Sequence, residues 1–470
     1  MCLSRVGLIG VLVLCVPLAA AAAAPTLLRE TFDAADAKLP PGWRVTRGTW
    51  RVDKGTLVAD SLKGEAYVLA GDADWENYEI EATATFVQVR DPGRWLSIVF
   101  RAPDDDSTPF SHFPIRQKTT ARNGTEFAVK TTWKHWSVRA TAKATADAKL
   151  GVPRRLRVLV QGTRVQAYLD GQRVIESQFC VDRQAGCVGL GASGCVARFD
   201  DFVVRALPNS PKPTLQAERP ERCICIAHRG FSAVYPENTM LAVMKGIEAG
   251  AEGIEFDVYN SSDRIPVLMH DKTVQRTTDG QGEVAKLTLE QLRKLDAGAW
   301  KNKKFAGEPV PTLADVLGKM KATTAKAMIE IKPDGIAREI VAAVRAADMV
   351  DQVVAISFSG RACADVHALE PRLPVALVVG GKPKGTMTEQ ADSLCGKAKK
   401  CGATILDLNY KMLSAEFVAE LRKRGFRVWC WTVDSPVAMA ALARWGVEAI
   451  TTNRPDLMIQ WRRDLANSRK

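Results

Sequence analysis

CICIAHRGFSAVYPENTMLAVMKGIEAGAEGIEFDV, residues 223–258, is the stretch that decides the fold of the C-terminal half of this 470-residue chain. It begins and ends with short apolar runs, Cys223–Ala227 and Gly253–Val258, of the length expected for buried strands. The residues between them carry the signals of an amphipathic helix, namely a cap, an apolar face and a glycine stop: Asn238 or Thr239, then Leu241, Met244 and Ile247, then Gly250. The stretch therefore predicts a strand, a helix and a second strand.

The same alternation continues to the end of the chain. Six further apolar runs are separated by helical patterns: Ala327–Ile331, Val353–Phe358, Val375–Val379, Thr404–Leu408, Val428–Val433 and Ala449–Thr452. Eight strands that alternate with helices over roughly 250 residues are typical of a (β/α)8 arrangement, so we expect an α/β TIM barrel. The extended segment Ile265–Met269 is expected to form a hairpin with the second strand.

The N-terminal half has a different pattern. From Leu27 to about Ala206, short alternating runs are separated by turns, as in a sandwich of antiparallel sheets. The runs are Trp43–Val45, Trp50–Val52, Tyr78–Val87, Leu96–Arg101, Leu156–Gln161, Val165–Leu169 and Phe199–Val204. The dipeptide Asp170-Gly171 favours a tight hairpin turn. This half is therefore predicted to be an all-β jelly-roll sandwich.

Four motifs of this half resemble those of concanavalin-like jelly rolls in laminin-G-type and keto-disaccharide-hydrolase-type domains: GTWRVDKGTLVA (48–59), WENYEIEATATF (75–86), AYLDGQRV (167–174) and ARFDDFVV (197–204). The resemblance suggests a glycan or a cell-surface ligand for the sandwich. Six tryptophans lie here: Trp43, Trp50, Trp75, Trp95, Trp133 and Trp136. An exposed one could stack on a sugar, but packing in the core or on a sheet is the favoured role because large aromatic side chains dominate sandwich cores.

We expect four segments along the chain: a signal peptide over residues 1–24, the concanavalin-like sandwich over 25–207, a linker over 208–221 and the barrel over 222–470. The first segment has Arg5, an apolar run Val6–Val16 and an alanine run Ala19–Ala24, which together are typical of a secretory leader. The linker is rich in proline and polar residues. The protein is therefore predicted to be exported, periplasmic or extracellular. No later stretch is long and apolar enough for a membrane span.

Cysteine and charge content limit the partners. Of eleven cysteines, Cys2 and Cys15 fall in the leader, so nine remain in a compartment that permits disulfides. Five could supply bridges, although small buried side chains are an equally good interpretation: Cys180, Cys187, Cys195, Cys395 and Cys401.

The formal net charge of +12 favours anionic partners. The basic residues are scattered and resemble no nucleic-acid module, so no nucleic-acid partner is expected.

Acidic residues stand at the ends of two predicted barrel strands. Alternate residues of a strand point to the same side, so Glu255 and Asp257 share one face, as do Glu330 and Lys332. Barrel enzymes build their sites at the carboxyl ends of strands. Three carboxylates that meet there would repel one another unless a hard divalent cation bound them. The alternative, salt bridges at the rim with Lys332, stays open on this pattern alone.

Two histidines favour a catalytic site. His228 in IAHRG and His270 in PVLMHD stand directly after predicted strands, and imidazoles beside carboxylates suit acid and base work near neutral pH. Arg229, next to His228, offers a fork that matches phosphate oxygens. His367 falls on a predicted helix and is interpreted as a surface residue.

The motifs AHRG, PENT, GIEFDV, HD, RTTDGQG, LDAG, PTLADVL, IEIK, WCWTVD and TTNRPD occur in the order found in glycerophosphodiester phosphodiesterases. The chain resembles this family over Cys223–Met458. The resemblance implies one divalent cation, Ca2+ or Mg2+. It also implies a role for each candidate residue: acid/base catalysis for His228 and His270, cation binding for Glu255, Asp257 and Glu330, phosphate contacts for Arg229 and Lys332, and an apolar wall near the glycerol for Trp431.

The activity that the resemblance implies is metal-dependent hydrolysis of glycerophosphodiesters to glycerol 3-phosphate and an alcohol. Two alternatives stay open. One is a lysophospholipase-D-like or sphingomyelinase-D-like action on lipids, which needs an apolar groove beside Trp431. The other is a non-catalytic glycan-binding surface protein. The chain departs from the family at Asn453, where the family often has Asp, and this leaves the local hydrogen bonding undecided.

Overall fold

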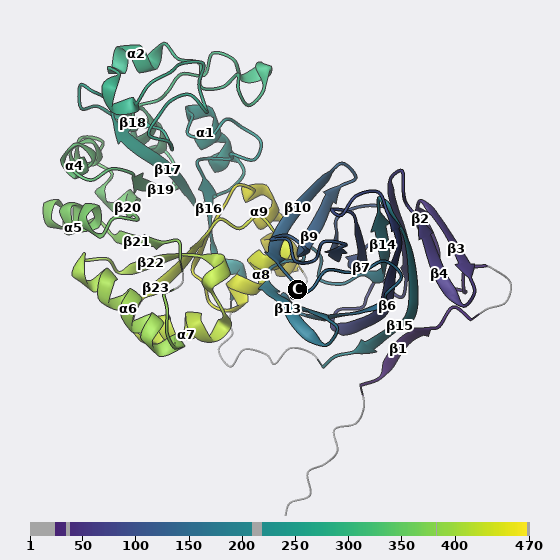
Figure 1. The fold of residues 1–470 in the computed structure, drawn as a ribbon. Coiled ribbons are helices and arrows are strands. Elements are labelled where there is room, and N and C mark those ends of the chain that lie inside the picture. The colour runs from purple at the N-terminus through teal and green to yellow at the C-terminus, as the bar shows by residue number, and fades with distance from the viewer. Residues whose placement is uncertain (1–23, 34–37, 209–218, 382, 468–470) are drawn as a thin grey trace, which may run out of the picture.

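The computed structural model describes residues 24–33, 38–208, 219–381 and 383–467, which form two parts that lie side by side (Figure 1). Within these residues the N-terminal part consists of strands, and the C-terminal part alternates strands and helices. Apart from Ala24, the predicted signal peptide lies outside the described residues, and so does most of the predicted linker, over 209–218. Both stay predictions.

The N-terminal part is a sandwich of two antiparallel sheets. One has the strand order β13-β12-β11-β6-β15-β4-β3, with β1 also paired to β15, and the other has the order β10-β9-β8-β7-β14-β5-β2. The strands are β1 (Thr26–Glu30), β2 (Arg44–Arg47), β3 (Thr49–Asp53), β4 (Thr56–Asp60), β5 (Glu65–Ala70), β6 (Tyr78–Val89), β7 (Trp95–Ala102), β8 (Phe110–Arg116), β9 (Thr125–Thr132), β10 (His135–Ala142), β11 (Arg154–Gln161), β12 (Arg164–Leu169), β13 (Gln172–Gln178), β14 (Cys187–Ser193) and β15 (Cys195–Ala206). Alternate residues of both sheets, such as Ile80 and Phe113, fill one shared core. The predicted all-β sandwich is confirmed.

The predicted hairpin turn lies between β12 and β13. Asp170 and Gly171 both have positive φ, 49° and 81°, which is the conformation that this tight turn requires and that aspartate and glycine adopt at low cost. Leu169 pairs directly with Gln172 across the turn.

The sandwich tryptophans pack within the protein. Trp43 is buried in the core at 7% exposure. Three half-buried ones form a smaller aromatic cluster with Tyr67 on the other face of the second sheet: Trp95, Trp133 and Trp136. In this cluster the Trp136 ring stacks on the buried His112, with the ring centroids 3.9 Å apart. Sheet packing, the favoured interpretation of these residues, agrees with this arrangement.

All nine cysteines among the described residues are buried and unbonded: Cys180, Cys187, Cys195, Cys223, Cys225, Cys363, Cys395, Cys401 and Cys430. The five candidates for bridges therefore serve as small apolar side chains in the core, the second of the two interpretations.

The C-terminal part is a closed barrel of eight parallel strands in the order β16-β17-β19-β20-β21-β22-β23-β24, with β24 paired back to β16. The strands are β16 (Ile224–His228), β17 (Gly253–Asn260), β19 (Lys326–Ile331), β20 (Val353–Ser357), β21 (Val375–Val379), β22 (Ile405–Asn409), β23 (Arg427–Trp431) and β24 (Ala449–Thr452). Each predicted run overlaps one of them, so the α/β TIM barrel is confirmed. The short strand β18 (Pro266–Leu268) pairs antiparallel with β17 and forms the predicted hairpin.

Helices surround the barrel (Figure 1). They are α1 (Met240–Glu248), α2 (Leu289–Arg293), α3 (Leu313–Met320), α4 (Ala337–Ala346), α5 (Gly360–Leu369), α6 (Met387–Lys400), α7 (Ala415–Lys423), α8 (Pro436–Arg444) and α9 (Pro455–Asn467), with the short 3-10 helices η1 (Pro220–Arg222), η2 (Val284–Lys286), η3 (Lys303–Phe305), η4 (Val350–Gln352) and η5 (Tyr410–Met412). Apolar side chains such as Met328, Ile405 and Trp429 fill the inside of the barrel. A polar site therefore has room mainly at the mouth, where the strands end.

Helix α1 is capped as predicted but buries a different face. The hydroxyl of Thr239 accepts a hydrogen bond from the amide of Ala242 at 3.2 Å. The most buried positions are small ones: Ala242, Val243 and Gly246. The predicted apolar face is only half-buried: Leu241, Met244 and Ile247. A Cβ at Gly246 would lie 2.9 Å from Ile254 on β17, so small residues allow the close approach of helix and strand.

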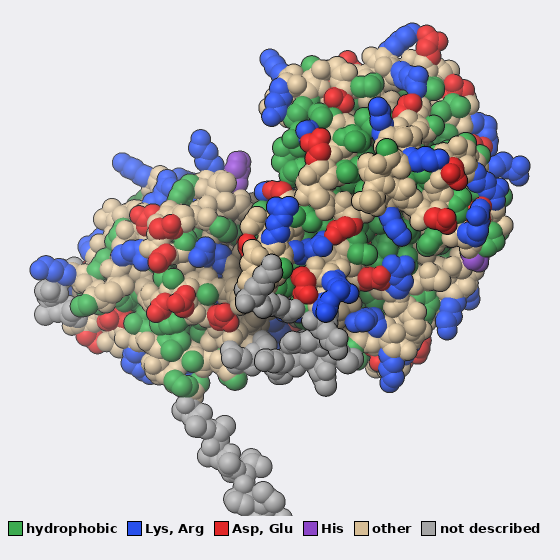
Figure 2. All heavy atoms as spheres, turned by 180° about the vertical axis from the view of Figure 1, so that it is seen from behind, with side chains coloured by type: hydrophobic (Ala, Val, Ile, Leu, Met, Phe, Trp, Pro, Cys, Tyr) green, Lys and Arg blue, Asp and Glu red, His purple; other side chains and the backbone are tan. Residues whose placement is uncertain are grey.

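The surface in Figure 2 carries Lys and Arg side chains scattered among acidic and apolar ones, as the sequence predicts. Among the described residues no helix is long and apolar enough to cross a membrane.

Candidate active site

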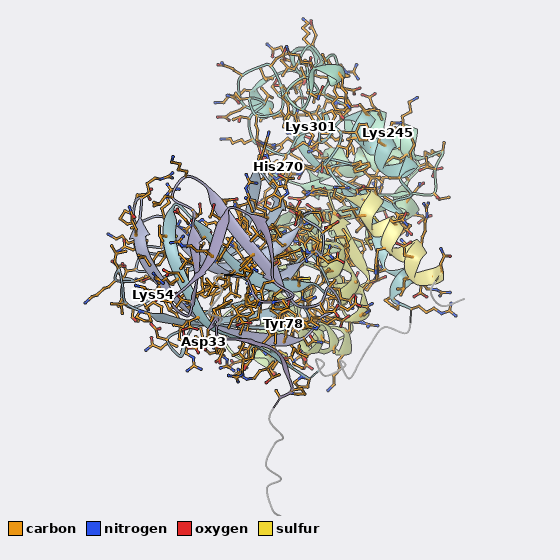
Figure 3. All side chains as sticks on the ribbon, turned by 90° about the vertical axis from the view of Figure 1, so that its right-hand side faces the viewer. Asp33, Lys54, Tyr78, Lys245, His270 and Lys301 are labelled. Carbon is orange, nitrogen blue, oxygen red and sulfur yellow. The ribbon has the colours of Figure 1, made fainter. Side chains whose placement is uncertain are left out.

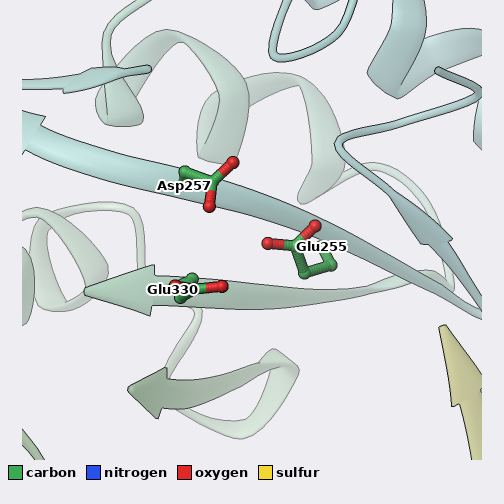
Figure 4. A group of neighbouring side chains, drawn as sticks. All are labelled: Glu255, Asp257 and Glu330. Atoms are coloured by element: carbon green, nitrogen blue, oxygen red, sulfur yellow. The ribbon is translucent and has the colours of Figure 1, made fainter. Parts of the chain in front are cut away.

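Three carboxylates meet inside the mouth of the barrel (Figure 4). Glu255 and Asp257 project from β17, and Glu330 projects from the adjacent strand β19, where it is the register partner of Asp257. One oxygen from each carboxylate lies within 4.8 Å of the other two. β17 continues past Asp257 to Asn260 because its last residues pair with β18, so these acids lie within the strand rather than at its end.

Burial makes this carboxylate cluster unstable without added positive charge. Burial, and then the charges of Asp257 and Glu330, raise the pKa of Glu255 well above its ordinary value. Burial, and then the charge of Asp257, raise the pKa of Glu330. Oε1 of Glu255, a residue that is 2% exposed, has no hydrogen-bond partner among the described residues. Three hard oxygen donors with one of them unsatisfied fit Ca2+ or Mg2+.

Lys332 neutralises part of the cluster. Its Nζ donates to Oδ1 of Asp257 at 3.1 Å and to Oε1 of Glu330 at 2.7 Å. Burial raises the pKa of Asp257, but the charges of Lys332 and Arg229 outweigh it and lower that pKa. The salt-bridge interpretation thus describes two of the three carboxylates. It leaves Glu255 unpaired by Lys332, so it does not replace a cation.

Arg229 is held against the cluster. Its backbone amide donates to Oε2 of Glu255 at 2.9 Å, and its Nε lies 3.4 Å from Oδ2 of Asp257. Its NH1 donates to Oε1 of Glu237 at 2.7 Å, and Arg276 donates to both oxygens of Glu237. Although burial raises the pKa of Glu237, the hydrogen bond from Arg276 and the charge of Arg229 lower it to about 2. Glu237 therefore stays ionised and fixes the orientation of the Arg229 guanidinium.

His228, the last residue of β16, is oriented by Asn453. Nδ1 of His228 lies 2.7 Å from Oδ1 of Asn453, and Nδ2 of Asn453 donates to Asp434 at 2.8 Å. Because the Asp434 carboxylate can only accept, the amide nitrogen must face it, and Nδ1 of His228 must be the donor to Oδ1. Nε2 therefore carries the lone pair, 3.8 Å from Oε2 of Glu255. Burial, and then the charge of Arg229, lower the pKa of His228 to about 4, so this histidine is neutral at pH 7.

His270 follows β18 and is oriented by a carboxylate instead. Its Nδ1 lies 2.6 Å from Oδ1 of Asp271. The hydrogen bond from Arg276, together with that from His270, lowers the pKa of Asp271 to about 2, so the partner of His270 is an anion. Figure 3 labels His270 on the barrel part of the molecule, above the sandwich. The two histidines therefore have matched geometry but differently charged partners.

Trp431, at the end of β23, forms an apolar wall with Phe358. Its indole Nε1 donates to the backbone oxygen of Asp407 at 3.2 Å, which fixes the ring. The Phe358 and Trp431 ring centroids are 5.4 Å apart at 80°. Phe358, which directly follows β20, is 52% exposed. The two rings therefore lie together at the ends of β20 and β23.

The structure thus places all eight candidate residues at one mouth of the barrel, and it adds partners to which the sequence interpretation assigned no role in the site. These are Glu237, Asn238, Asp271, Arg276, Asp434 and Asn453. Asn238, for example, donates from Nδ2 to Oδ2 of Asp257 at 2.8 Å. All six lie in quoted motifs, Asn453 in TTNRPD, so motif membership was the signal that marked them. His367 lies on α5 and packs near Gly402, so it does not join the site.

The Asn453–Asp434 pair leads to a testable expectation. Asn453→Asp would place two carboxylates against each other, because Asp434 accepts from both the backbone amide and Nδ2 of residue 453. We expect this variant to lose at least about tenfold in kcat/KM and about 1 kcal/mol of stability. The double variant Asp434→Asn/Asn453→Asp exchanges amide and carboxylate and should recover most of both. Thermal unfolding and steady-state kinetics of the three proteins test this, and a double variant as poor as the single one would contradict it.

Comparison with known proteins shows which family the barrel half resembles. Residues 228–457 match the Glycerophosphoryl diester phosphodiesterase family. The chain is 34% identical over 249 residues to a glycerophosphodiester phosphodiesterase of Caldanaerobacter subterraneus subsp. tengcongensis. This alignment covers 51% of this chain and 97% of the relative. It is 33% identical over 275 residues to a glycerophosphodiester phosphodiesterase of Bacillus subtilis, covering 54% of this chain and 91% of the relative. A solved structure of an Oleispira antarctica phosphodiesterase in complex with the product sn-glycerol-3-phosphate is similar with a TM-score of 0.47 and 27% identity, over 51% of this chain and 96% of that chain.

The family match and the two relatives identify the barrel as an enzyme of the phosphoric diester hydrolase class. The chain belongs to the glycerophosphodiester phosphodiesterase family, and the family match lies wholly within the barrel. The family and the enzyme class predicted from the sequence are confirmed.

Proposed function

We propose that the protein hydrolyses glycerophosphodiesters to glycerol 3-phosphate and an alcohol, with one divalent cation, Ca2+ or Mg2+. The observation that carries the proposal is the grouping of Glu255, Asp257 and Glu330 with two oriented histidines at one mouth of the barrel. Family membership supports the same activity.

His228 and His270 divide the proton transfers. Nε2 of His228 has its lone pair free because Nδ1 is committed to Asn453, so Nε2 can take the proton from the 2-hydroxyl of the glycerol. That oxygen attacks phosphorus and the alcohol leaves, with its proton supplied by His270. The cyclic glycerophosphate then opens with water, and the two histidines exchange roles.

Charged groups support the phosphate during these steps. Lys332 uses two of its three N–H donors on Asp257 and Glu330, which leaves one for a phosphate oxygen. The Arg229 guanidinium lies beside the same carboxylates and adds positive charge. Glu255, Asp257 and Glu330 would hold the cation, which when bound supplies Lewis-acid stabilisation of charge on the phosphate.

An apolar groove favours a second candidate function, action on a lipid phosphodiester. The groove holds about 580 Å³ and adjoins the Phe358–Trp431 wall. It is lined by Phe358, Gly360, Leu377, Val378, Val379, Gly380, Lys397, Lys400 and Cys401. A Cβ at Gly380 would lie 3.5 Å from Phe358 and 3.8 Å from Trp431, so this glycine stands where the wall meets the groove. A lysophospholipase-D-like substrate would place its acyl chain here.

One assay tests both candidates. With Ca2+ or Mg2+, we expect the full chain to release glycerol 3-phosphate and choline from glycerophosphocholine. If the groove takes an acyl chain, lysophosphatidylcholine should also release choline, and Gly380→Leu should reduce that reaction at least about tenfold while sparing glycerophosphocholine. No phosphodiester cleavage of either substrate would contradict the proposed function. Equal effects of Gly380→Leu on both substrates would remove the lipid candidate.

Export to the periplasm or the cell exterior is proposed from the leader-like residues 1–24. A glycan or cell-surface ligand for the concanavalin-like sandwich has less support, because its half-buried tryptophans pack against one another and against Tyr67. The non-catalytic alternative has no support from the site, where each catalytic candidate has an orienting partner.

A further inference from the structure

The sandwich inserts one side chain into the core of the barrel part. Phe179 follows β13 and is 2% exposed. It belongs to the core cluster that packs between the barrel strands and helices. Its ring centroid lies 5.2 Å from that of Tyr410, in η5, and 5.5 Å from that of Trp445, at the end of α8. Tyr410 directly follows β22, so Phe179 reaches a loop at the mouth of the barrel.

A second contact is made by a barrel side chain that packs against the sandwich. Val437, in the first turn of α8, packs against the core of the sandwich. α8 therefore contacts the sandwich near its start through Val437 and near its end through Trp445, and Figure 1 shows it on the side of the barrel that faces the sandwich.

The start of α8 is connected to His228. Asp434 lies two residues before Pro436, the first residue of α8, and its carboxylate accepts hydrogen bonds from the backbone amide and Nδ2 of Asn453 at 2.8 Å each. Oδ1 of Asn453 accepts from His228 at 2.7 Å. A shift of α8 would therefore move Asp434, and with it the amide that orients the imidazole.

Charges from both parts meet at Tyr410. Burial is the first cause that raises its pKa, and the charges of Arg139 and Asp182 in the sandwich and of Asp434 in the barrel also act on it. Arg139 and Asp182 form an ion pair at 2.8 Å. The sandwich therefore approaches the Asp434 region through Tyr410 as well as through α8.

We propose that the sandwich sets the orientation of His228 through α8, with Phe179 and Val437 as positioning residues. The proposal rests on the role of His228 in the proposed function. Removal of the Phe179 ring leaves a hole between Tyr410 and Trp445, so α8 loses its support on that side. The candidate cation and phosphate ligands on β17 and β19, and Lys332 directly after β19, belong to other strands and should keep their positions.

The test compares Phe179→Ala with Phe86→Ala in the full chain. Phe86 is a similarly buried phenylalanine that packs in the core cluster of the sandwich, whereas Phe179 packs in the core cluster of the barrel. We expect Phe179→Ala to lower kcat on glycerophosphocholine about 10- to 100-fold with KM nearly unchanged, because small misplacements of a catalytic group cost rate rather than binding. Phe86→Ala should keep kcat. Val437→Ala, a smaller truncation, should also lower kcat. It replaces Phe179→Ala in the test if that variant does not fold.

Two measurements separate positioning from loss of stability. In a double-mutant cycle with Asn453→Ala, the Phe179→Ala loss should largely disappear, because both changes act on His228. The 15N NMR signal of His228 Nδ1–H should shift or broaden in Phe179→Ala and not in Phe86→Ala. An unchanged kcat, a loss that persists in the Asn453→Ala background, or an unchanged imidazole signal would overturn the proposal. If the wild type cleaves no phosphodiester, the proposed function fails, while the NMR comparison still tests the connection.

Discussion

His270→Ala is expected to lose about 100- to 10,000-fold in kcat/KM on glycerophosphocholine and far less on a nitrophenyl glycerophosphodiester. This difference follows from the proposed role of His270 as the acid that protonates the leaving alcohol. Its Nδ1 contacts the anion Asp271, which fixes the orientation of the imidazole ring. Nitrophenolate leaves without protonation, so loss of the acid should matter little for that substrate.

His228→Ala should be impaired on both substrates, because the attacking hydroxyl must lose its proton whatever group leaves. Its partner Asn453 is neutral, and its own pKa of about 4 keeps it unprotonated at pH 7, as a base must be. The measurement is kcat/KM of both variants on both substrates, with circular dichroism as the folding control. Equal losses for His270→Ala on the two substrates would contradict its role as the acid, and a selective rescue of His228→Ala would show that the roles are reversed.

The barrel and its charged mouth could be predicted because their signals are local. Strand periodicity put Glu255 and Asp257 on one side of β17, and barrel topology brought Glu330 beside them. The parallel register of β17 and β19 brings the three carboxylates together although they are far apart in the sequence. Their proximity can therefore be predicted once the strands are assigned correctly. The two histidines could be placed in the same way, because His228 ends β16 and His270 comes two residues after β18.

Side-chain contacts that depend on the tertiary structure could not be predicted from the sequence. Asn453 and Asp434 come from β24 and β23 loops, and only their mutual hydrogen bonds show why an amide stands at residue 453. The buried face of α1 depends on how closely Gly246 approaches β17, which helical periodicity does not encode. The insertion of Phe179 into the barrel depends on the placement of the sandwich, for which no local pattern exists.

Glu255→Gln is expected to abolish most activity and yet to stabilise the protein when no divalent cation is present. The pKa of Glu255 is raised in the folded state, so its contribution to stability is fully present below its unfolded value and is lost as pH rises through the folded value. At neutral pH the buried carboxylate therefore costs stability, and a neutral amide of the same shape removes that cost, which is about 1–4 kcal/mol for comparable buried charges. Gln can still accept the hydrogen bond that the Arg229 amide donates to Oε2.

A bound cation should make the wild type, rather than Glu255→Gln, the more stable protein. Ca2+ or Mg2+ should raise the unfolding temperature of the wild type, because it binds the folded cluster, and should leave Glu255→Gln nearly unchanged. We expect kcat/KM of the variant to fall at least about 1,000-fold, since Lewis-acid stabilisation supplies several kcal/mol to the transition state. Glu290→Gln, on the surface helix α2, is the matched carboxylate-to-amide control and should keep wild-type activity and cation response. Differential scanning calorimetry with and without chelator gives the stabilities, and full wild-type activity after exhaustive chelation would exclude the cation site on Glu255, Asp257 and Glu330.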